Sequence, residues 1–443
     1  MSLMTLYSFK QLNRSDLEQL TGRPAADWPG VIQTVTPILE SVRVEGDTAV
    51  LRYTEQFDGI TPDPAWIDPN AEQAVLPKAE KSAIDQAIRN VALFHSQQQR
   101  GTLRVETSPG ISCSRVSRPI DRVGLYIPGG SAPLPSTAIM LAVPATVAGC
   151  STLVMATPPD QDGRVPQPIR YIAQETGVKG ILLAGGAQAI AAMAYGTETV
   201  PKVDKLFGPG NQYVTAAKMA LQNSNALVSI DLPAGPSELL VIADRSANPE
   251  WIAADLLSQA EHGEDSQVVL VSLPGFDLDG LNQSLTAQLN TLPRKKIAEE
   301  ALKKSFILSC ATPDEAIRFS NLYAPEHLIL NTRKAAEQTD QIQNAGSVFV
   351  GPWTPESLGD YASGTNHTLP TYGYARMYSG VSLESFQKQI TFQTATESGL
   401  REIGTVVETL AEMEGLSAHA RAVRIRLGEA DSRTDGSTKQ KTS

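Results

Sequence analysis

Short apolar runs alternate with helical patterns between about residues 120 and 350. The runs have the length of buried strands and are rich in Val, Ile and Leu. They cover residues 123–127, 152–156, 180–183, 205–207, 239–243, 268–272, 306–309, 327–330 and 347–350. Helical patterns separate them, at residues 168–175, 188–195, 212–222, 249–259, 313–321 and 333–344. This alternation predicts mostly parallel sheet, and so many strands favour two α/β domains over one.

Both ends of the chain have a different pattern. The first 100 residues are mostly helical in pattern, most clearly at residues 78–98. Residues 382–427 also have a helical pattern, with a break near Gly399. Residues 431–443 contain no apolar side chain, which predicts a disordered tail.

Charge and composition exclude some functions. The 443 residues carry a net charge of −11, with no cluster of Lys and Arg, which argues against nucleic acid and anionic membrane as partners. The longest charge-free run, residues 123–159, is interrupted by prolines and glycines and cannot form one membrane-spanning helix. Three widely spaced cysteines and an N-terminus without a signal-peptide pattern predict a cytoplasmic protein with free thiols.

Gln259 and His262 form the first candidate site. Asn248 and Pro249 are typical of a helix start and Gly263 of a helix end. Positions three apart share a helix face, so the amide and the imidazole can hold one ligand between them. A polar helix C-terminus, where the dipole favours His, explains the same residues without a ligand.

Three further segments combine carboxylates with histidines. Glu326 and His327 stand directly before an apolar strand and suit proton transfer, although a capped turn fits equally well. Asp360 and His367 lie in a long polar segment typical of a site or of a surface turn. Glu414 and His419 are five residues apart on the C-terminal segment; alone they indicate only a polar helix break.

Three glycine-containing loops follow apolar runs and precede helices. They are Gly129-Gly130-Ser131, Gly185-Gly186-Ala187-Gln188 and Gly208-Pro209-Gly210-Asn211. Backbone amides in such loops can bind phosphate at a helix N-terminus. The dinucleotide fingerprint G-x-G-x-x-G is absent, so the loops indicate only a nucleotide site of unusual form.

Together these motifs resemble the histidinol dehydrogenase family over residues 20–427. The resemblance is carried by residues 123–130, 207–211, 233–238, 259–266, 324–328 and 357–370, in the order of the family. It implies a cytoplasmic homodimer that oxidises L-histidinol through L-histidinal to L-histidine, the last step of histidine biosynthesis. Each subunit would use one zinc ion, and each turnover two NAD.

The resemblance also implies a role for each motif residue. The zinc ligands would be Gln259, His262, Asp360 and His419, and the catalytic acid–base pair Glu326 and His327. The substrate contacts would be Ser237, Gln259, His262, His327, Asp360, His367, Glu414 and His419. Tyr126, Gln188 and Asn211 match the positions that contact NAD. His419 is expected to reach the zinc of the partner subunit.

The expected fold class is α/β, with two Rossmann-like domains that lack the G-x-G-x-x-G fingerprint and with small extensions at both ends. The expected division is an arm (1–25), a first α/β domain (26–125 plus 237–380), a second on the NAD side (126–236), a helical dimerisation extension (381–430) and the tail (431–443). Two other functions fit the residues: a zinc hydrolase in which Glu326 activates water, and a non-catalytic binder of an imidazole compound.

Overall fold

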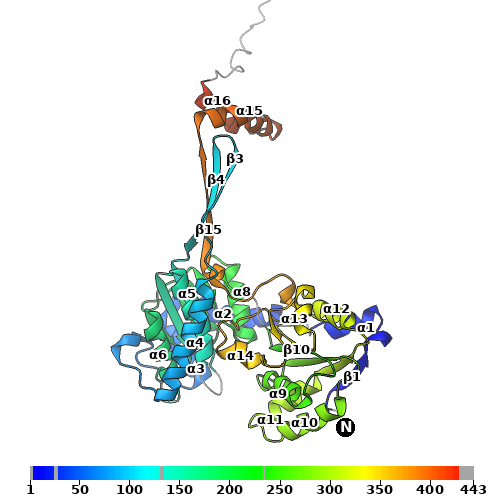
Figure 1. Ribbon diagram of the computed structural model, residues 1–443. Helices are drawn as coiled ribbons and strands as arrows, with labels where there is room; N and C mark the ends of the chain where they lie inside the picture. The colour runs from blue at the N-terminus through cyan, green and yellow to red at the C-terminus, as the bar shows by residue number, and fades with distance from the viewer. Residues whose placement is uncertain (1–2, 24–27, 130–133, 233–234, 429–443) are drawn as a thin grey trace, which may run out of the picture. The chain divides into compact units, whose positions relative to one another are not determined.

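The computed structural model describes residues 3–23, 28–129, 134–232 and 235–428 (Figure 1). The chain divides into two compact units. The first contains residues 1–99 and 120–386, and the second contains residues 100–119 and 387–443. Two six-stranded sheets lie in the first unit and a three-stranded sheet lies in the second. The predicted α/β class with two Rossmann-like sheets is confirmed.

Sheet 1 has the strand order β2-β7-β6-β5-β8-β9. Its strands are β2 (Trp66–Ile67), β5 (Arg122–Tyr126), β6 (Thr152–Thr157), β7 (Gly180–Leu183), β8 (Lys205–Phe207) and β9 (Ser229–Ile230). Strands β5 to β9 are parallel, and β2 runs antiparallel to β7 at one edge. The order reverses between β5 and β8, which is where ligands bind in open parallel sheets.

Sheet 2 repeats this arrangement with the order β1-β12-β11-β10-β13-β14. Its strands are β1 (Thr5–Ser8), β10 (Glu238–Ala243), β11 (Gln267–Ser272), β12 (Phe306–Ser309), β13 (His327–Asn331) and β14 (Ser347–Val350). All are parallel, including β1, by which the N-terminal arm extends the sheet edge. Strands buried on both faces explain the continuous apolar runs of the sequence.

Helices cover both sheets. Those before β10 are α1 (Arg14–Thr21), α2 (Trp28–Glu45), α3 (Asp47–Asp58), α4 (Lys78–Ser96), α5 (Pro135–Ala148), α6 (Gln167–Thr176), α7 (Gly186–Tyr195) and α8 (Gln212–Gln222). Those after it are α9 (Pro249–Ala260), α10 (Leu278–Leu289), α11 (Lys295–Lys303), α12 (Pro313–Tyr323), α13 (Ala335–Gln338) and α14 (Glu356–Tyr361). No helix among the described residues has the length and apolar character needed to cross a membrane.

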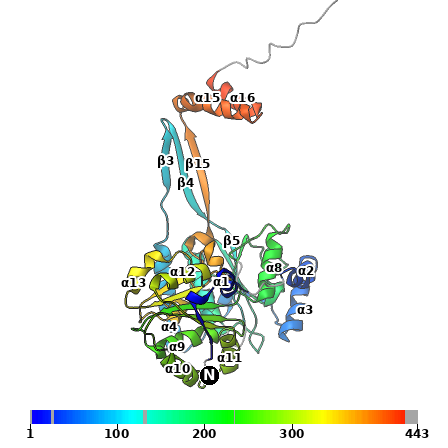
Figure 2. The same ribbon diagram turned by 90° about the vertical axis from the view of Figure 1, so that its right-hand side faces the viewer.

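The predicted assignment of residues 26–125 to the domain of residues 237–380 is wrong. Helix α2 packs on α7 and on α8, beside which it lies in Figure 2, and α4 packs on α5; α5, α7 and α8 all belong to sheet 1. Val35 and Leu39 of α2 share a core cluster with Val154, and Val91 of α4 shares one with Leu125. The amphipathic pattern of these helices shows that one face is buried, but not which sheet buries it.

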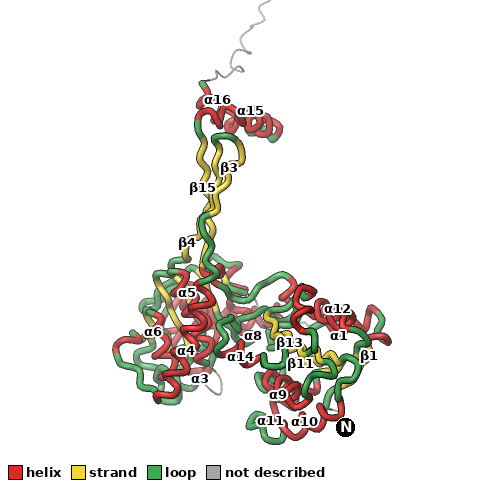
Figure 3. Tube along the Cα trace, in the orientation of Figure 1, coloured by secondary structure: helices red, strands yellow, loops and turns green. Residues whose placement is uncertain are grey.

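The second unit differs from the predicted helical extension, residues 381–430, because it also contains residues 100–119 and begins its C-terminal part at residue 387. Strands β3 (Leu103–Ser108), β4 (Ile111–Pro119) and β15 (Gln387–Ala395) form its antiparallel sheet (Figure 3). Helices α15 (Glu397–Met413) and α16 (Ser417–Leu427) follow β15. Residues 387–395 therefore form a strand rather than a helix, because pairing with β4 fixes them in extended conformation. The predicted tail, 431–443, lies outside the described residues.

The predicted strands of both parallel sheets are confirmed within one or two residues. The predicted helix 333–344 is shorter, since only α13 and a 3-10 turn at Thr339–Gln341 form there. Helix α5 occupies part of the charge-free run 123–159 and is almost wholly buried. A helix that is apolar on every side fits a buried position between other helices and a sheet.

Candidate active site

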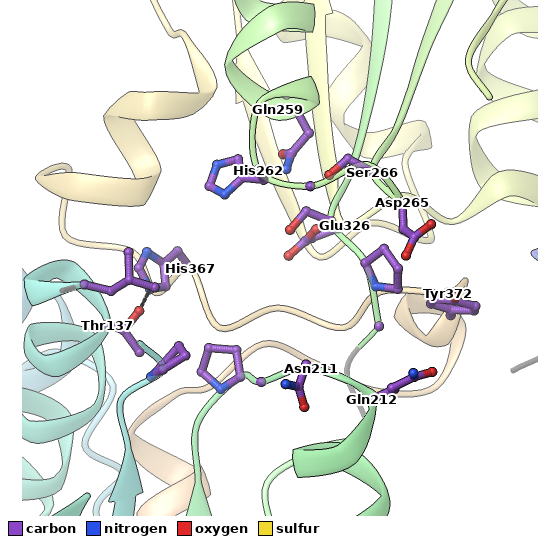
Figure 4. Close-up of a pocket in the computed structure, with 18 of the residues that line it drawn as sticks. Thr137, Asn211, Gln212, Gln259, His262, Asp265, Ser266, Glu326, His367 and Tyr372 are labelled. Carbon is purple, nitrogen blue, oxygen red and sulfur yellow. Dashed lines mark hydrogen bonds between the residues drawn. The ribbon is translucent and has the colours of Figure 1, made fainter. Parts of the chain in front are cut away.

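A pocket of about 640 Å³ in the first unit contains most of the predicted site residues (Figure 4). Pro128 and residues 209–213 line it from the segments that follow β5 and β8 of sheet 1. Ser237, Glu326 and His327 line it from the starts of β10 and β13 of sheet 2. The pocket therefore meets sheet 1 at the carboxyl ends of its strands and sheet 2 at the amino ends.

This orientation gives the two sheets different roles. The carboxyl edge of sheet 1, at the β5/β8 reversal, is the usual binding edge of an α/β sheet. The amino edge of sheet 2 is not, and it carries the titratable side chains. In a βαβ unit the C-terminus of each helix lies near the start of the next strand, so the end of α9 lies at the amino edge of sheet 2, the edge at which β13 also starts.

Gln259 and His262 lie at the C-terminal end of α9. Asn248 caps the start of this helix, its Oδ1 accepting from the Glu250 N–H at 2.9 Å. Gln259 is 1% exposed, and its Oε1 has no hydrogen-bond partner. His262 is exposed where it lines the pocket, yet desolvation by the surrounding protein lowers its pKa and so favours the neutral imidazole. A buried amide oxygen without a partner beside a neutral imidazole is typical of a metal site.

Helix α14 contributes two carboxylates one helical turn apart, Glu356 and Asp360. A nitrogen of His262 and one oxygen of each carboxylate lie within 4.8 Å of one another. Burial raises the pKa of Glu356 well above its usual value. For Asp360, burial acts in the same direction, but interactions with His327, His367 and His262 outweigh it and lower the pKa. Glu356 was not predicted; its i, i+4 spacing from Asp360 would have indicated it had this segment been expected to be helical.

Glu326 and His327 are both buried at the start of β13. His327 Nδ1 lies 3.7 Å from Glu326 Oε2 and 3.9 Å from Glu356 Oε1, and Nε2 lies 3.4 Å from Asp360 Oδ1. Burial raises the pKa of Glu326 to about 8. Burial alone would lower the pKa of His327, but the carboxylates around it raise the value to about 10. The Glu326 carboxyl group can therefore stay protonated near neutral pH, and the His327 ring favours its charged form.

His367 is held from both sides. Its Nδ1 lies 2.8 Å from the Asp360 carbonyl oxygen, and its Nε2 lies 3.3 Å from Thr137 Oγ1. Because a carbonyl oxygen can only accept, Nδ1 carries the proton and the neutral ring accepts from the Thr137 hydroxyl at Nε2 (Figure 4). Burial lowers the pKa of His367 and favours that neutral form. Thr137 had no signal in the sequence.

The three predicted cofactor residues lie at or just beyond the carboxyl edge of sheet 1. Tyr126 ends β5, and its hydroxyl accepts from the Gly186 N–H at 3.1 Å. Gln188 on α7 is 1% exposed, with an Oε1 that has no hydrogen-bond partner. Asn211 caps α8, its Oδ1 accepting from the N–H groups of Tyr213 and Val214. Asn211 lines the pocket, whereas Tyr126 and Gln188 are buried and do not line it.

Glu414 and His419 belong to the second unit. Glu414 follows the last residue of α15, and His419 lies in the first turn of α16. Both residues are exposed. Of the predicted ligand set, Gln259, His262 and Asp360 therefore line one pocket of the first unit. The unpredicted Glu356 does not line it but lies close to His262 and Asp360.

Comparison with known proteins identifies the family. The sequence profile of histidinol dehydrogenase matches residues 21–427. The chain belongs to the histidinol dehydrogenase family. It is 55% identical to the chloroplastic histidinol dehydrogenase of Arabidopsis thaliana over 433 residues, covering 97% of this chain and 93% of the relative. It is 52% identical to the histidinol dehydrogenase of Schizosaccharomyces pombe over 425 residues, covering 95% and 97%.

A solved structure of the family has the same fold. The crystal structure of histidinol dehydrogenase from Elizabethkingia anophelis matches with a TM-score of 0.90 and 48% identity, covering 97% of this chain and 99% of that one. The family assignment confirms the resemblance found in the motifs. Membership makes the protein an oxidoreductase of histidine biosynthesis.

Proposed function

We propose that the protein oxidises L-histidinol through L-histidinal to L-histidine, with two NAD per turnover and one zinc ion per subunit, as a cytoplasmic homodimer. The observation that carries this proposal is the clustering of His262, Asp360, Glu326 and His327 in one pocket beside the carboxyl edge of sheet 1. The free state of all three cysteines supports a reducing compartment.

The donor set at the end of α9 fits zinc. Imidazole nitrogen and carboxylate oxygen are ordinary zinc ligands, and His262, Glu356 and Asp360 bring such atoms together. The unpartnered Oε1 of Gln259 gains a partner if it binds the ion. We propose Gln259, His262, Asp360 and His419 of a partner copy as the ligands. Glu356 adds negative charge beside them, which further favours a cation.

When bound, zinc would orient the substrate's imidazole and amine, and NAD would accept the hydride. The protein's own residues move the protons. Because the Glu238 carbonyl accepts from Nδ1 of His327, the basic nitrogen of the neutral ring is Nε2. Nε2 lies 3.4 Å from Asp360 Oδ1, and the carboxylates around the ring raise its pKa to about 10, so once neutral the ring is a strong base that can take the alcohol proton. Ser237 and His367 line the same pocket, and we propose that they contact the substrate, as Glu414 does from the partner copy.

Aldehyde oxidation requires a water molecule to be activated, and we assign this step to Glu326. Its raised pKa makes the carboxylate a stronger base than an exposed glutamate. His327, next to it, can then take up the next proton. Retaining the aldehyde in a closed pocket prevents loss of a reactive intermediate.

The support for NAD is the position of Tyr126, Gln188 and Asn211. They lie at the carboxyl edge of the sheet that reverses its strand order there. The N-terminus of α8 lines the pocket, and the positive end of the helix dipole there suits a pyrophosphate. Gln188 offers a buried, unpartnered amide oxygen beside this edge.

Two assays test the function. Zinc-loaded protein supplied with histidinol and excess NAD should release about two NADH per histidinol, because alcohol and aldehyde are oxidised in turn. A zinc hydrolase or a non-catalytic binder would release none. NAD at about 100 times its dissociation constant should stabilise the folded protein by about 2.7 kcal/mol, which a thermal melt measures. A melting temperature that NAD leaves unchanged would favour the hydrolase.

Complementation tests whether His419 acts in the partner's site. His419→Asn and His262→Asn should each be inactive alone. Heterodimers of the two variants should contain one intact site, because the chain that keeps His262 meets the partner that keeps His419. A random mixture should then recover about a quarter of wild-type activity. If His419 served its own chain, every site would lack one ligand and no activity would return.

A further inference from the structure

A buried ion pair lies behind the acid–base residues. Arg23, just after α1, meets Glu238, the first residue of β10. Arg23 Nε donates to Glu238 Oε1 at 2.7 Å, and a terminal nitrogen donates to Oε2 at 2.8 Å. The two side chains are 7% and 4% exposed. Neither residue lines the pocket.

The main chain of Glu238 contacts both catalytic residues. Its N–H donates to Glu326 Oε2 at 2.8 Å, and its carbonyl oxygen accepts from His327 Nδ1 at 3.2 Å. These contacts fix the orientation of the carboxylate and select which nitrogen of the imidazole is free. A shift of residue 238 would therefore move both groups together.

The side chain of Glu238 also holds a wall of the pocket. Its Oε1 accepts from the Tyr372 N–H at 3.0 Å. Tyr372 lines the pocket with a left-handed backbone (φ 56°), and its ring packs so closely on Gly235 that a side chain there would collide with it. Glu238 thus joins the acid–base pair to the part of the pocket wall that Tyr372 forms.

Arg23 is itself held in place. Its guanidinium lies 3.6 Å from the centre of the Tyr323 ring, and it donates to the carbonyl oxygens of Thr21 and Tyr323. Tyr323 is fully buried and donates from its hydroxyl to Gln267 at 2.7 Å. A buried ion pair adds little net stability compared with apolar side chains, so this fixed geometry suggests a positioning role.

We propose that Arg23 and Glu238 are positioning residues for the acid–base pair: the bidentate pair fixes the main chain of residue 238, which aims Glu326 and His327 at the substrate. Neither side chain touches the substrate. The inference rests on the proposed function. The alternative is a purely structural role, in which the Arg23–Glu238 pair only attaches the N-terminal segment to sheet 2.

The test is the double variant Arg23→Met/Glu238→Gln, which removes both charges and leaves no buried ion unpaired. We expect a folded protein with wild-type zinc content and a KM within about threefold of wild type, because Gln259, His262 and Asp360 do not contact the pair. We expect kcat to fall about 10-fold to 100-fold, as for other groups that orient catalytic residues. Arg23→Lys should recover only part of kcat, since an ammonium cannot form the bidentate contact.

The matched control is Arg170→Met, which removes an equally buried arginine (5% exposed) that pairs with Glu72 and does not line the pocket. It should leave kcat unchanged. Wild-type kcat in the double variant would overturn the positioning role. If that variant fails to fold, wild-type kcat in a folded Arg23→Lys would do the same. A wild-type enzyme without activity on histidinol would instead contradict the proposed function.

Discussion

Replacing His262 by asparagine should release zinc at neutral pH and abolish turnover. The imidazole is the only nitrogen donor among the three clustered ligand candidates of the described residues, and an amide is a much weaker zinc ligand. Metal analysis of the purified variant should give far less than one zinc per subunit. Activity should fall about 100-fold or more, because zinc orients the substrate in the proposed reaction.

Gln212→Ala is the control for this experiment. Gln212 lines the pocket from the start of α8, away from His262 (Figure 4). The Gln212→Ala variant should therefore retain zinc. Stoichiometric zinc in His262→Asn would rule out His262 as a ligand. The pH dependence gives an independent check. Desolvation lowers the pKa of His262 and favours the neutral ring that binds zinc, so zinc should dissociate as the pH falls and protons compete for the nitrogen.

Replacing Glu326 by glutamine should separate the two oxidation steps. Only aldehyde oxidation needs an activated water, and an amide cannot accept its proton. With histidinal as substrate, we expect the rate to fall about 100-fold to 10,000-fold. With histidinol, a single-turnover measurement of the first NADH should show a much smaller loss, because His327 remains to take the alcohol proton.

The wild-type pH profile provides the matching observation. Burial raises the pKa of Glu326 to about 8, and the base is active only as the carboxylate. Aldehyde oxidation should therefore increase with pH up to about 8 and lose this increase in Glu326→Gln. Equal losses in both steps would show that Glu326 does not activate the water. Glu264→Gln, an exposed carboxylate at the pocket rim, should change neither step.

The helix end that carries Gln259 and His262 was predictable as structure but ambiguous as chemistry. Asn248, Pro249 and Gly263 bound the helix in the sequence, and the observed α9 agrees. A polar helix end and a metal site nevertheless have the same local pattern. The structure favours the metal site because it buries the oxygen of Gln259 without a partner and places Asp360, about 100 residues later, beside His262.

Other features depended on long-range packing. Helix α4 was predictable from its period, yet its contact with α5 was not, because many apolar surfaces can bury the same face. Residues 387–395 formed a strand against their helical pattern, since pairing with β4 satisfies the extended backbone. Thr137 and the Arg23–Glu238 pair had no pattern that marks them, and Glu356 would have been indicated only by its helical spacing from Asp360.

The sequence by itself determined most strands and several helices of the two parallel sheets, although not β1, β2 and β9, and, through motifs in the family's order, the family. Those properties are local: period, caps and turn residues act within a few positions of one another. Only the tertiary structure decided that the pocket meets the carboxyl edge of one sheet and the amino edge of the other. It alone joined Glu238 to Glu326, 88 residues away, because such contacts depend on strand order and register.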